Sequence, residues 1–154
     1  MWEALFAFTN IWALLAWVLL LAFPRTALTH SAIMYLGVGL LCLIYLVTFA
    51  LLFGGLVDPV RAAGSAEPGF SSIAGIRGFF GSDAGVVIGW AHYLAFDLFT
   101  GLWISRDADA KQFGRLAQVP FLVLTYLAGP IGLFAWLAVR ERAARRLARA
   151  QKTA

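Results

Sequence analysis

The chain of 154 residues is poor in charge and contains one cysteine and two histidines. Asp, Glu, Lys and Arg make up 13% of the residues, hydrophobic residues make up 62%, and the mean hydropathy is +0.82. A soluble domain of this length cannot bury so much apolar surface, whereas lipid can solvate it. The composition therefore excludes a soluble globular protein and predicts an integral membrane protein with a single domain over residues 1–154.

The scarcity of cysteine and histidine limits the chemistry that the chain can support. Cys42 is the single cysteine, so neither an intrachain disulfide nor a cysteine-based metal site can form. His30, His92 and Asp97 do not have the spacing of a known metal-ligand set. The sequence also lacks a nucleophile elbow, a phosphate-binding loop and a dinucleotide fingerprint. We therefore expect no metal and no cofactor.

Basic residues are not distributed as they are in a nucleic-acid-binding protein. The net charge of +4 is concentrated beside long apolar runs, above all in the tail over residues 140–154, rather than along a soluble face. We therefore expect membrane lipid as the surrounding partner, and no nucleic acid.

Four long apolar runs predict an all-α, polytopic protein with four transmembrane helices, because about 20 apolar residues cross a bilayer as a helix. The predicted spans cover residues 4–23, 32–53, 85–105 and 117–139. The fourth span contains Gly129, Pro130 and Gly132. A proline inside a helix removes one backbone donor, so we expect a kink there that frees the carbonyl of Tyr126.

The segment 54–83 interrupts this pattern with Gly-Gly, Asp-Pro and Pro-Gly pairs, which are typical of a loop. Within it, Phe70, Ile73, Ile76 and Phe79 recur at a helical spacing. This spacing predicts a segment that lies in the membrane interface or folds back over the bundle. The alternative is a flexible loop with scattered apolar residues.

Four spans would place both termini on the same side of the membrane. Lys and Arg are more numerous in the segments on that side than in the opposite loops, which predicts cytoplasmic termini. The first apolar run begins near residue 1 without a basic leader or a transit peptide. We therefore expect a multi-pass protein of the bacterial inner (cell) membrane.

The third run, GVVIGWAHYLAFDLFTGLWISR over residues 85–106, holds His92 and Asp97 near its midpoint. A carboxylate at this depth costs at least ~2.5 kcal/mol, so it requires a partner, a proton or a cavity. Two buried ionisable groups of this kind suit proton transfer near neutral pH. The alternative is that both side chains only join helices by hydrogen bonds. Asp97 and His92 are therefore candidate catalytic residues, with the structural alternative left open.

On a helix, His92 and Asp97 lie about 140° apart, so they flank one pocket only if the helix is central and is contacted on two sides. By depth, Asn10 in the first span lies level with His92. The stripe of Asp97 holds Trp90, Tyr93 and Gly101, whereas the stripe of His92 holds Phe96, Phe99 and Trp103. Asn10 and the aromatic members of both stripes are the candidate substrate-binding residues.

Several of these motifs resemble those of a known family. GWAHYLAFDLFTGLWISRDA in the third span and AGPIGLFAWL in the fourth are similar to the abscisic-acid-deficient-four-like family of small polytopic membrane proteins. LLLAFPR and FSSIAGIRGFFGS are similar as well, so the resemblance covers most of the chain. The family pattern falls on Trp90, His92, Asp97, Gly101, Gly129, Pro130 and Gly132, and the four Gly and Pro positions among these are taken as structural.

Plant members of that family act in plastids in making neoxanthin from violaxanthin, an isomerisation of a carotenoid epoxide to an allene. The resemblance implies that this protein acts on a carotenoid or related isoprenoid, or assists an enzyme that does. A non-enzymatic scaffold that binds lipid or pigment is the alternative, and the sequence leaves open whether the protein is an enzyme. These hypotheses imply three kinds of partner: a carotenoid, a second copy of the chain and a carotenoid enzyme.

Overall fold

The computed structural model describes residues 1–23, 26–61, 63–64 and 66–152, and within them every regular element is helical. This confirms the all-α class. Three helices are long and apolar enough to cross a membrane: Trp2–Ala22, Ala27–Phe53 and Asp83–Ala110. They correspond to the first three predicted spans. The chain is therefore a helical membrane protein, although its fourth predicted span has a different structure.

The second of these long helices changes its hydrogen bonding along its length. It consists of α2 (Ala27–Ala32), a π-helical segment η1 (Ile33–Val38) and α3 (Gly39–Phe53). Gly37 lies in the π-helical segment, where an added Cβ would press on side chains of Leu98 and Ala16. The small residue thus allows this helix to approach its two neighbours closely.

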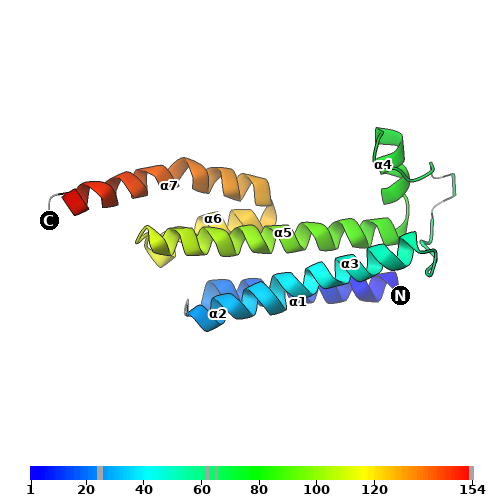
Figure 1. Ribbon diagram of the computed structural model, residues 1–154, viewed down its shortest axis with the longest axis horizontal. Coiled ribbons are helices and arrows are strands. Elements are labelled where there is room, and N and C mark those ends of the chain that lie inside the picture. The colour runs from blue at the N-terminus through cyan, green and yellow to red at the C-terminus, as the bar shows by residue number, and fades with distance from the viewer. Residues whose placement is uncertain (24–25, 62, 65, 153–154) are drawn as a thin grey trace.

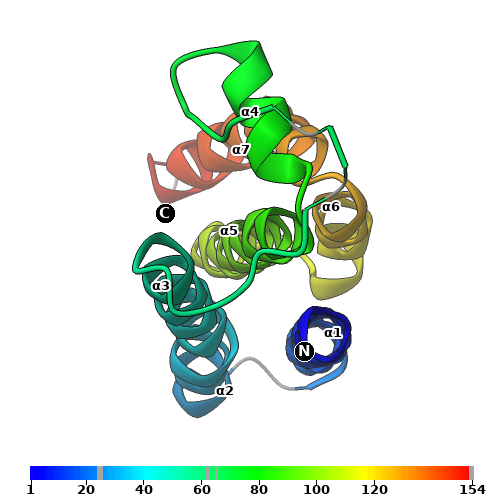
Figure 2. The same cartoon turned by 90° about the vertical axis from the view of Figure 1, so that its right-hand side faces the viewer.

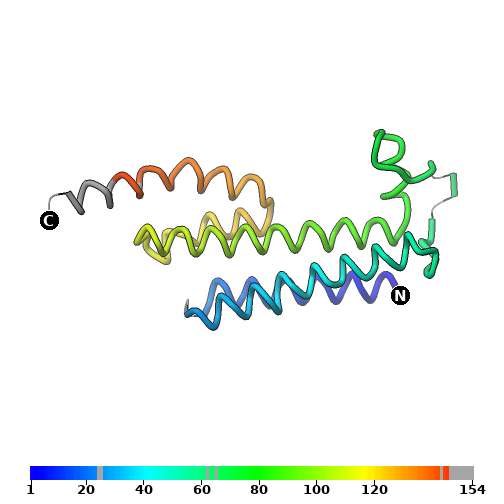
Figure 3. Tube along the Cα trace, in the orientation of Figure 1, coloured from blue at the N-terminus to red at the C-terminus, as the bar shows by residue number. Residues whose placement is uncertain are grey.

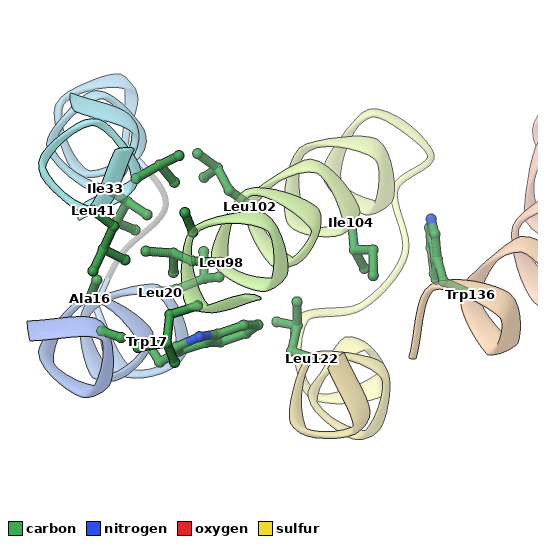
Figure 4. Close-up of a cluster of buried hydrophobic side chains, with 14 of the residues drawn as sticks. Ala16, Trp17, Leu20, Ile33, Leu41, Leu98, Leu102, Ile104, Leu122 and Trp136 are labelled. Atoms are coloured by element: carbon green, nitrogen blue, oxygen red, sulfur yellow. The ribbon is translucent and has the colours of Figure 1, made fainter. Parts of the chain in front are cut away.

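The central element of the molecule is α5 (Asp83–Ala110), which contacts α1, η1, α3, α4, α6 and α7. Figure 2 shows it surrounded by the other elements, with α1 (Trp2–Ala22) on one side. In Figure 4 the indole of Trp17 reaches from α1 toward Leu122, beside α5. Gly101 of α5 lies under this indole, and a Cβ there would overlap the ring. The glycine therefore creates the notch in which Trp17 is buried.

The fourth predicted span, over residues 117–139, is wrong. The chain forms a helical hairpin instead, in which α6 (Arg115–Leu127) ends and α7 (Gly129–Lys152) runs back beside it (Figure 1). With 13 residues, α6 is about 20 Å long, which is too short to cross the ~30 Å hydrocarbon core. The four-span bundle is thus replaced by three long helices and a hairpin.

The Gly-Pro pair explains why the helix stops rather than bends. Ala128 has extended backbone angles, with φ of −159° and ψ of 85°, and its carbonyl accepts the first hydrogen bonds of α7. Pro130 therefore lies in the first turn of α7, where its missing N–H costs no hydrogen bond. The expectation of a kink in a continuous helix is wrong, because α6 ends at Leu127 and α7 begins at Gly129. Gly132 faces α6, and a Cβ there would overlap Thr125.

The hairpin also changes the course of the last part of the chain. From the hairpin turn, α7 runs toward the end of the bundle that is opposite the start of α1, as Figures 1 and 3 show. The structure does not test the prediction that both termini lie on the same side of the membrane. Which end faces the cytoplasm stays a prediction. Residues 153–154 of the basic tail lie outside the described part of the chain.

Between the second and third long helices, the chain forms a short helix at one end of the bundle. This helix, α4 (Ile73–Phe80), lies across the direction of α5 (Figure 1). Ser72 caps it, because its hydroxyl accepts a hydrogen bond from the Gly75 N–H at 3.0 Å. The helical spacing predicted for this segment is therefore present, and its position in the membrane interface stays a prediction.

Candidate functional site

Asp97 lies in the middle of α5, beneath the turn of the α6–α7 hairpin. Its side chain is buried, and the residue is only 7% exposed. A Cβ added to Gly129 would overlap the Asp97 carboxylate, so the backbone of the hairpin turn rests directly on this group. The Gly129 backbone therefore lies against the carboxylate and interacts with it. The carboxylate therefore sits at the start of α7.

This contact gives a physical reason for an aspartate at membrane depth. The first N–H groups of a helix have no partner within the helix, and lipid offers no acceptor for them. The start of a helix also carries a partial positive charge of roughly +0.5, which a carboxylate complements. Asp97 thus stabilises the point where α7 begins. The contact supports the alternative that Asp97 only joins helices. It does not give a role to the second carboxylate oxygen, Oδ2.

Tyr93 is the second polar neighbour of Asp97. It lies one turn earlier on α5, and its hydroxyl interacts with the Asp97 carboxylate. The same hydroxyl lies 3.4 Å from the carbonyl oxygen of Leu127. The other carboxylate oxygen, Asp97 Oδ2, is buried and has no hydrogen-bond partner among the described residues. An unpartnered buried acceptor is costly, which marks this oxygen as a functional candidate.

A polar and aromatic band leads from the surface toward this carboxylate. The Trp90 indole donates to Asn10 Oδ1 at 3.0 Å, and Asn10 in turn donates to the Phe6 carbonyl at 2.7 Å. Trp90 stacks on Tyr93, with the ring centroids 5.2 Å apart. The structure therefore joins Asn10, Trp90, Tyr93 and Asp97 into one continuous group. Asn10 belongs with Trp90 rather than with His92.

His92 lies on a different face of α5, and its side chain is exposed. Its ring packs against Phe96, with centroids 4.6 Å apart, and against Tyr45 of α3, with centroids 5.7 Å apart. Asp97, by contrast, faces the hairpin. The structure does not bring the two predicted catalytic residues together, because different helices cover the two faces of α5.

The other members of the His92 stripe also remain accessible. Phe96 is 57% exposed and Phe99 is 44% exposed, and the guanidinium of Arg140 lies 5.6 Å from the centroid of the Trp103 ring. This aromatic stripe therefore provides an accessible apolar surface beside His92.

Sequence reasoning missed one polar cluster, which holds α7 against the far end of α5. The Asp107 carboxylate accepts hydrogen bonds from Arg140 at 2.9 and 3.0 Å, from Trp136 at 2.9 Å and from Lys111 at 2.6 Å. The spacing of Asp107 and Lys111, four residues apart on a helix, is a signal that was present in the sequence. The same i, i+4 spacing relates Tyr93 to Asp97.

The fold and the site define a class: a polytopic helical membrane protein with a helical hairpin docked on an intramembrane carboxylate. A family model described as "ABA4-like: ABA DEFICIENT 4-like" matches residues 4–136, which is most of the chain. The chain therefore belongs to the ABA4-like family, as the resemblance predicted. The match includes α1, α5 and the hairpin turn. Neither a curated protein nor a solved structure matches the chain.

Proposed function

We propose that this protein takes a carotenoid or related isoprenoid from the bilayer and isomerises it, with Tyr93 and Asp97 as the acid and the base. The observation that carries the proposal is the buried Asp97 Oδ2, which has no hydrogen-bond partner among the described residues and lies beside a tyrosine hydroxyl. Family membership supports the substrate class, since the family is related to neoxanthin synthesis.

The geometry suggests how an epoxide would be opened. Tyr93 would donate its proton to the epoxide oxygen, and Asp97 Oδ2 would remove a proton from carbon, so the product is an isomer of the substrate. Asp97 would then return the proton to the neighbouring Tyr93. In this proposal Tyr93 takes the role that the sequence assigned to His92. His92 and its aromatic stripe would instead contact the apolar part of the ligand.

Access to the site is consistent with a ligand that is dissolved in lipid. Trp90 is 37% exposed, and its ring stacks on Tyr93, which leads to the carboxylate. A ring at the end of a polyene could therefore reach Tyr93 from the membrane along the exposed Trp90 side chain, without passing through water. Its flat apolar body suits the stacked faces of Trp90 and Tyr93.

The test is the pigment composition of a host that makes an epoxy-carotenoid and expresses the protein. Asp97→Asn and Tyr93→Phe should each lower formation of the isomeric product, the first by ~10²-fold or more. Tyr126→Phe is the matched control: it removes a hydroxyl from a tyrosine of α6 whose ring packs on Trp17. Wild-type product levels in a well-folded Asp97→Asn variant would end the acid–base proposal.

A non-enzymatic binding role is the second candidate, and one observation favours it. The contact between Asp97 and the Gly129 backbone already gives the carboxylate a purely structural task. In that case the exposed aromatic rings would hold pigment for a second copy of the chain or for a carotenoid enzyme. Pigment that co-purifies with the protein and shows an unchanged chromatographic retention would support binding, whereas an isomer would support catalysis.

A further inference from the structure

A cavity of about 430 Å³ lies at the end of the bundle where α4 is located. Its volume is within the range of roughly 300–1,000 Å³ that is usual for ligand pockets. It is enclosed by the end of α3, the following loop and the link between α4 and α5. Its walls include Leu52, Phe53, Val57, Pro59, Arg61 and Phe79.

The position of the cavity relative to the long helices sets its depth in the membrane. α3 ends at Phe53 and α5 begins at Asp83, and both belong to helices that are suited to cross a bilayer. Residues between these two ends must lie near one membrane surface. The glycerol and phosphate groups of lipids occupy this level, just outside the hydrocarbon core.

Arg61 is the charged group of the cavity. It lines the cavity, and 37% of its side chain is exposed, which places it at the opening. Its ion-pair partner is Glu67 at 3.6 Å, a side chain that is 94% exposed. An ion pair that water reaches so freely is weak, so the guanidinium can exchange it for another anion. Arginine binds phosphate oxygens with two parallel hydrogen bonds.

The backbone around Arg61 is held in place before any ligand binds. Arg61 and Ser82 form an isolated antiparallel bridge. The Asp83 and Ala84 N–H groups donate to the carbonyls of Val60 and Pro59, at 3.1 and 3.2 Å. These bonds tie the loop to the start of α5. A preorganised backbone lowers the entropy that binding would cost.

Aromatic rings continue from the cavity onto the lipid-facing surface. Phe70 lies 5.4 Å from Phe79 and 6.2 Å from Phe53, measured between ring centroids, and Phe53 stacks on Phe49 at 4.3 Å. Phe53 and Phe70 are 55% and 61% exposed. An acyl chain that leaves the cavity would therefore meet a continuous apolar surface along α3.

We propose that this cavity is a binding site for a zwitterionic glycerophospholipid of the ethanolamine type. The phosphate binds Arg61, the ammonium group faces Glu67, and one acyl chain begins between Phe53 and Phe79. The choice of lipid follows from charge, because Arg61 and Glu67 present opposite charges side by side and the head group carries the complementary pair. This site is separate from Asp97 and does not depend on the proposed isomerisation.

The experiment is native mass spectrometry of the purified full chain, titrated with phosphatidylethanolamine, with phosphatidylglycerol and with inorganic phosphate in separate arms. Arg61→Gln should weaken binding of phosphatidylethanolamine by about tenfold, since charge-assisted hydrogen bonds to the phosphate are lost. Arg77→Gln is the matched control, because Arg77 is an exposed arginine of the nearby α4. Glu67→Gln should remove a preference for phosphatidylethanolamine over phosphatidylglycerol.

A second variant keeps the test independent of the charge change. Val57→Trp fills the cavity and should lower lipid binding as strongly as Arg61→Gln, with thermal stability in detergent measured for both variants. Equal binding of phosphatidylethanolamine by the wild type and by Arg61→Gln would overturn the proposal. Binding of phosphatidylglycerol that is as tight as that of phosphatidylethanolamine, or displacement of bound lipid by millimolar phosphate, would overturn it too.

Discussion

Two faces of the same helix, α5, use polar residues in opposite ways. On one face Asp97 is buried under the hairpin turn and lies against the backbone of Gly129. On the other face His92 is exposed and packs its ring on Phe96 and Tyr45. Both residues are ionisable groups in an apolar run, and from the sequence both are candidate catalytic residues. The structure shows that Asp97 contacts the backbone of another segment, whereas His92 packs on aromatic side chains.

The difference follows from what covers each face. A broken helix places unpaired N–H groups in the membrane, and such groups need an acceptor from the protein. α3 is continuous beside His92, so its backbone offers no unpaired group that the imidazole could satisfy. The Asp97 face is therefore expected to be sensitive to small changes, whereas the His92 face should tolerate them. Three pairs of substitutions test this contrast.

The largest effect is expected from removing the two side chains themselves. Asp97→Ala removes the carboxylate that lies against the polar start of α7 and should lower the free energy of unfolding by about 3 kcal/mol. His92→Ala removes only exposed ring packing and should change it by about 0.5 kcal/mol or less. Thermal unfolding of both variants in the same detergent measures the contrast. Equal destabilisation by the two substitutions would show that the two faces are not different in this respect.

The next effect concerns the glycine above Asp97. Gly129→Ala introduces a Cβ that overlaps the carboxylate, so the hairpin must shift at a cost of about 2 kcal/mol. Gly114→Ala is the matched control at the start of α6, where an added Cβ meets no heavy atom within 4 Å. Limited proteolysis of the α6–α7 hairpin, together with thermal unfolding, measures both. Normal hairpin protection in Gly129→Ala would contradict the close docking.

The smallest effect is expected when a hydroxyl is removed from one of two tyrosines, Tyr93 beside Asp97 or Tyr45 beside His92. Tyr93→Phe removes the hydroxyl that bonds to the Leu127 carbonyl and interacts with Asp97, and it should cost about 1 kcal/mol of unfolding free energy. Tyr45→Phe keeps the ring that packs on His92, so its stability should match that of the wild type. Chemical unfolding of the two variants in one detergent compares them. A larger loss in Tyr45→Phe would reverse the contrast.

The sequence by itself determined the class of the protein and the position of its long helices. The three apolar runs that became α1, the α2–α3 helix and α5 are visible without coordinates, because only lipid can solvate such runs. Asp97 was also visible, since one charge in a long apolar segment is costly. The family match over residues 4–136 agrees with the motifs read from the chain.

Only the tertiary structure decided how the last apolar run folds and which residues meet. A Gly-Pro pair is compatible with a kink in a continuous helix and with a full reversal, and local propensity does not separate the two. The reversal is favoured by contacts that are distant in sequence: Asp97 lies against Gly129, and Asp107 and Arg140 hold α7 farther along its length. The pairing of Asp97 with Tyr93 rather than with His92 has the same origin. A helix has several faces, and which one a side chain uses depends on the neighbours that pack against it.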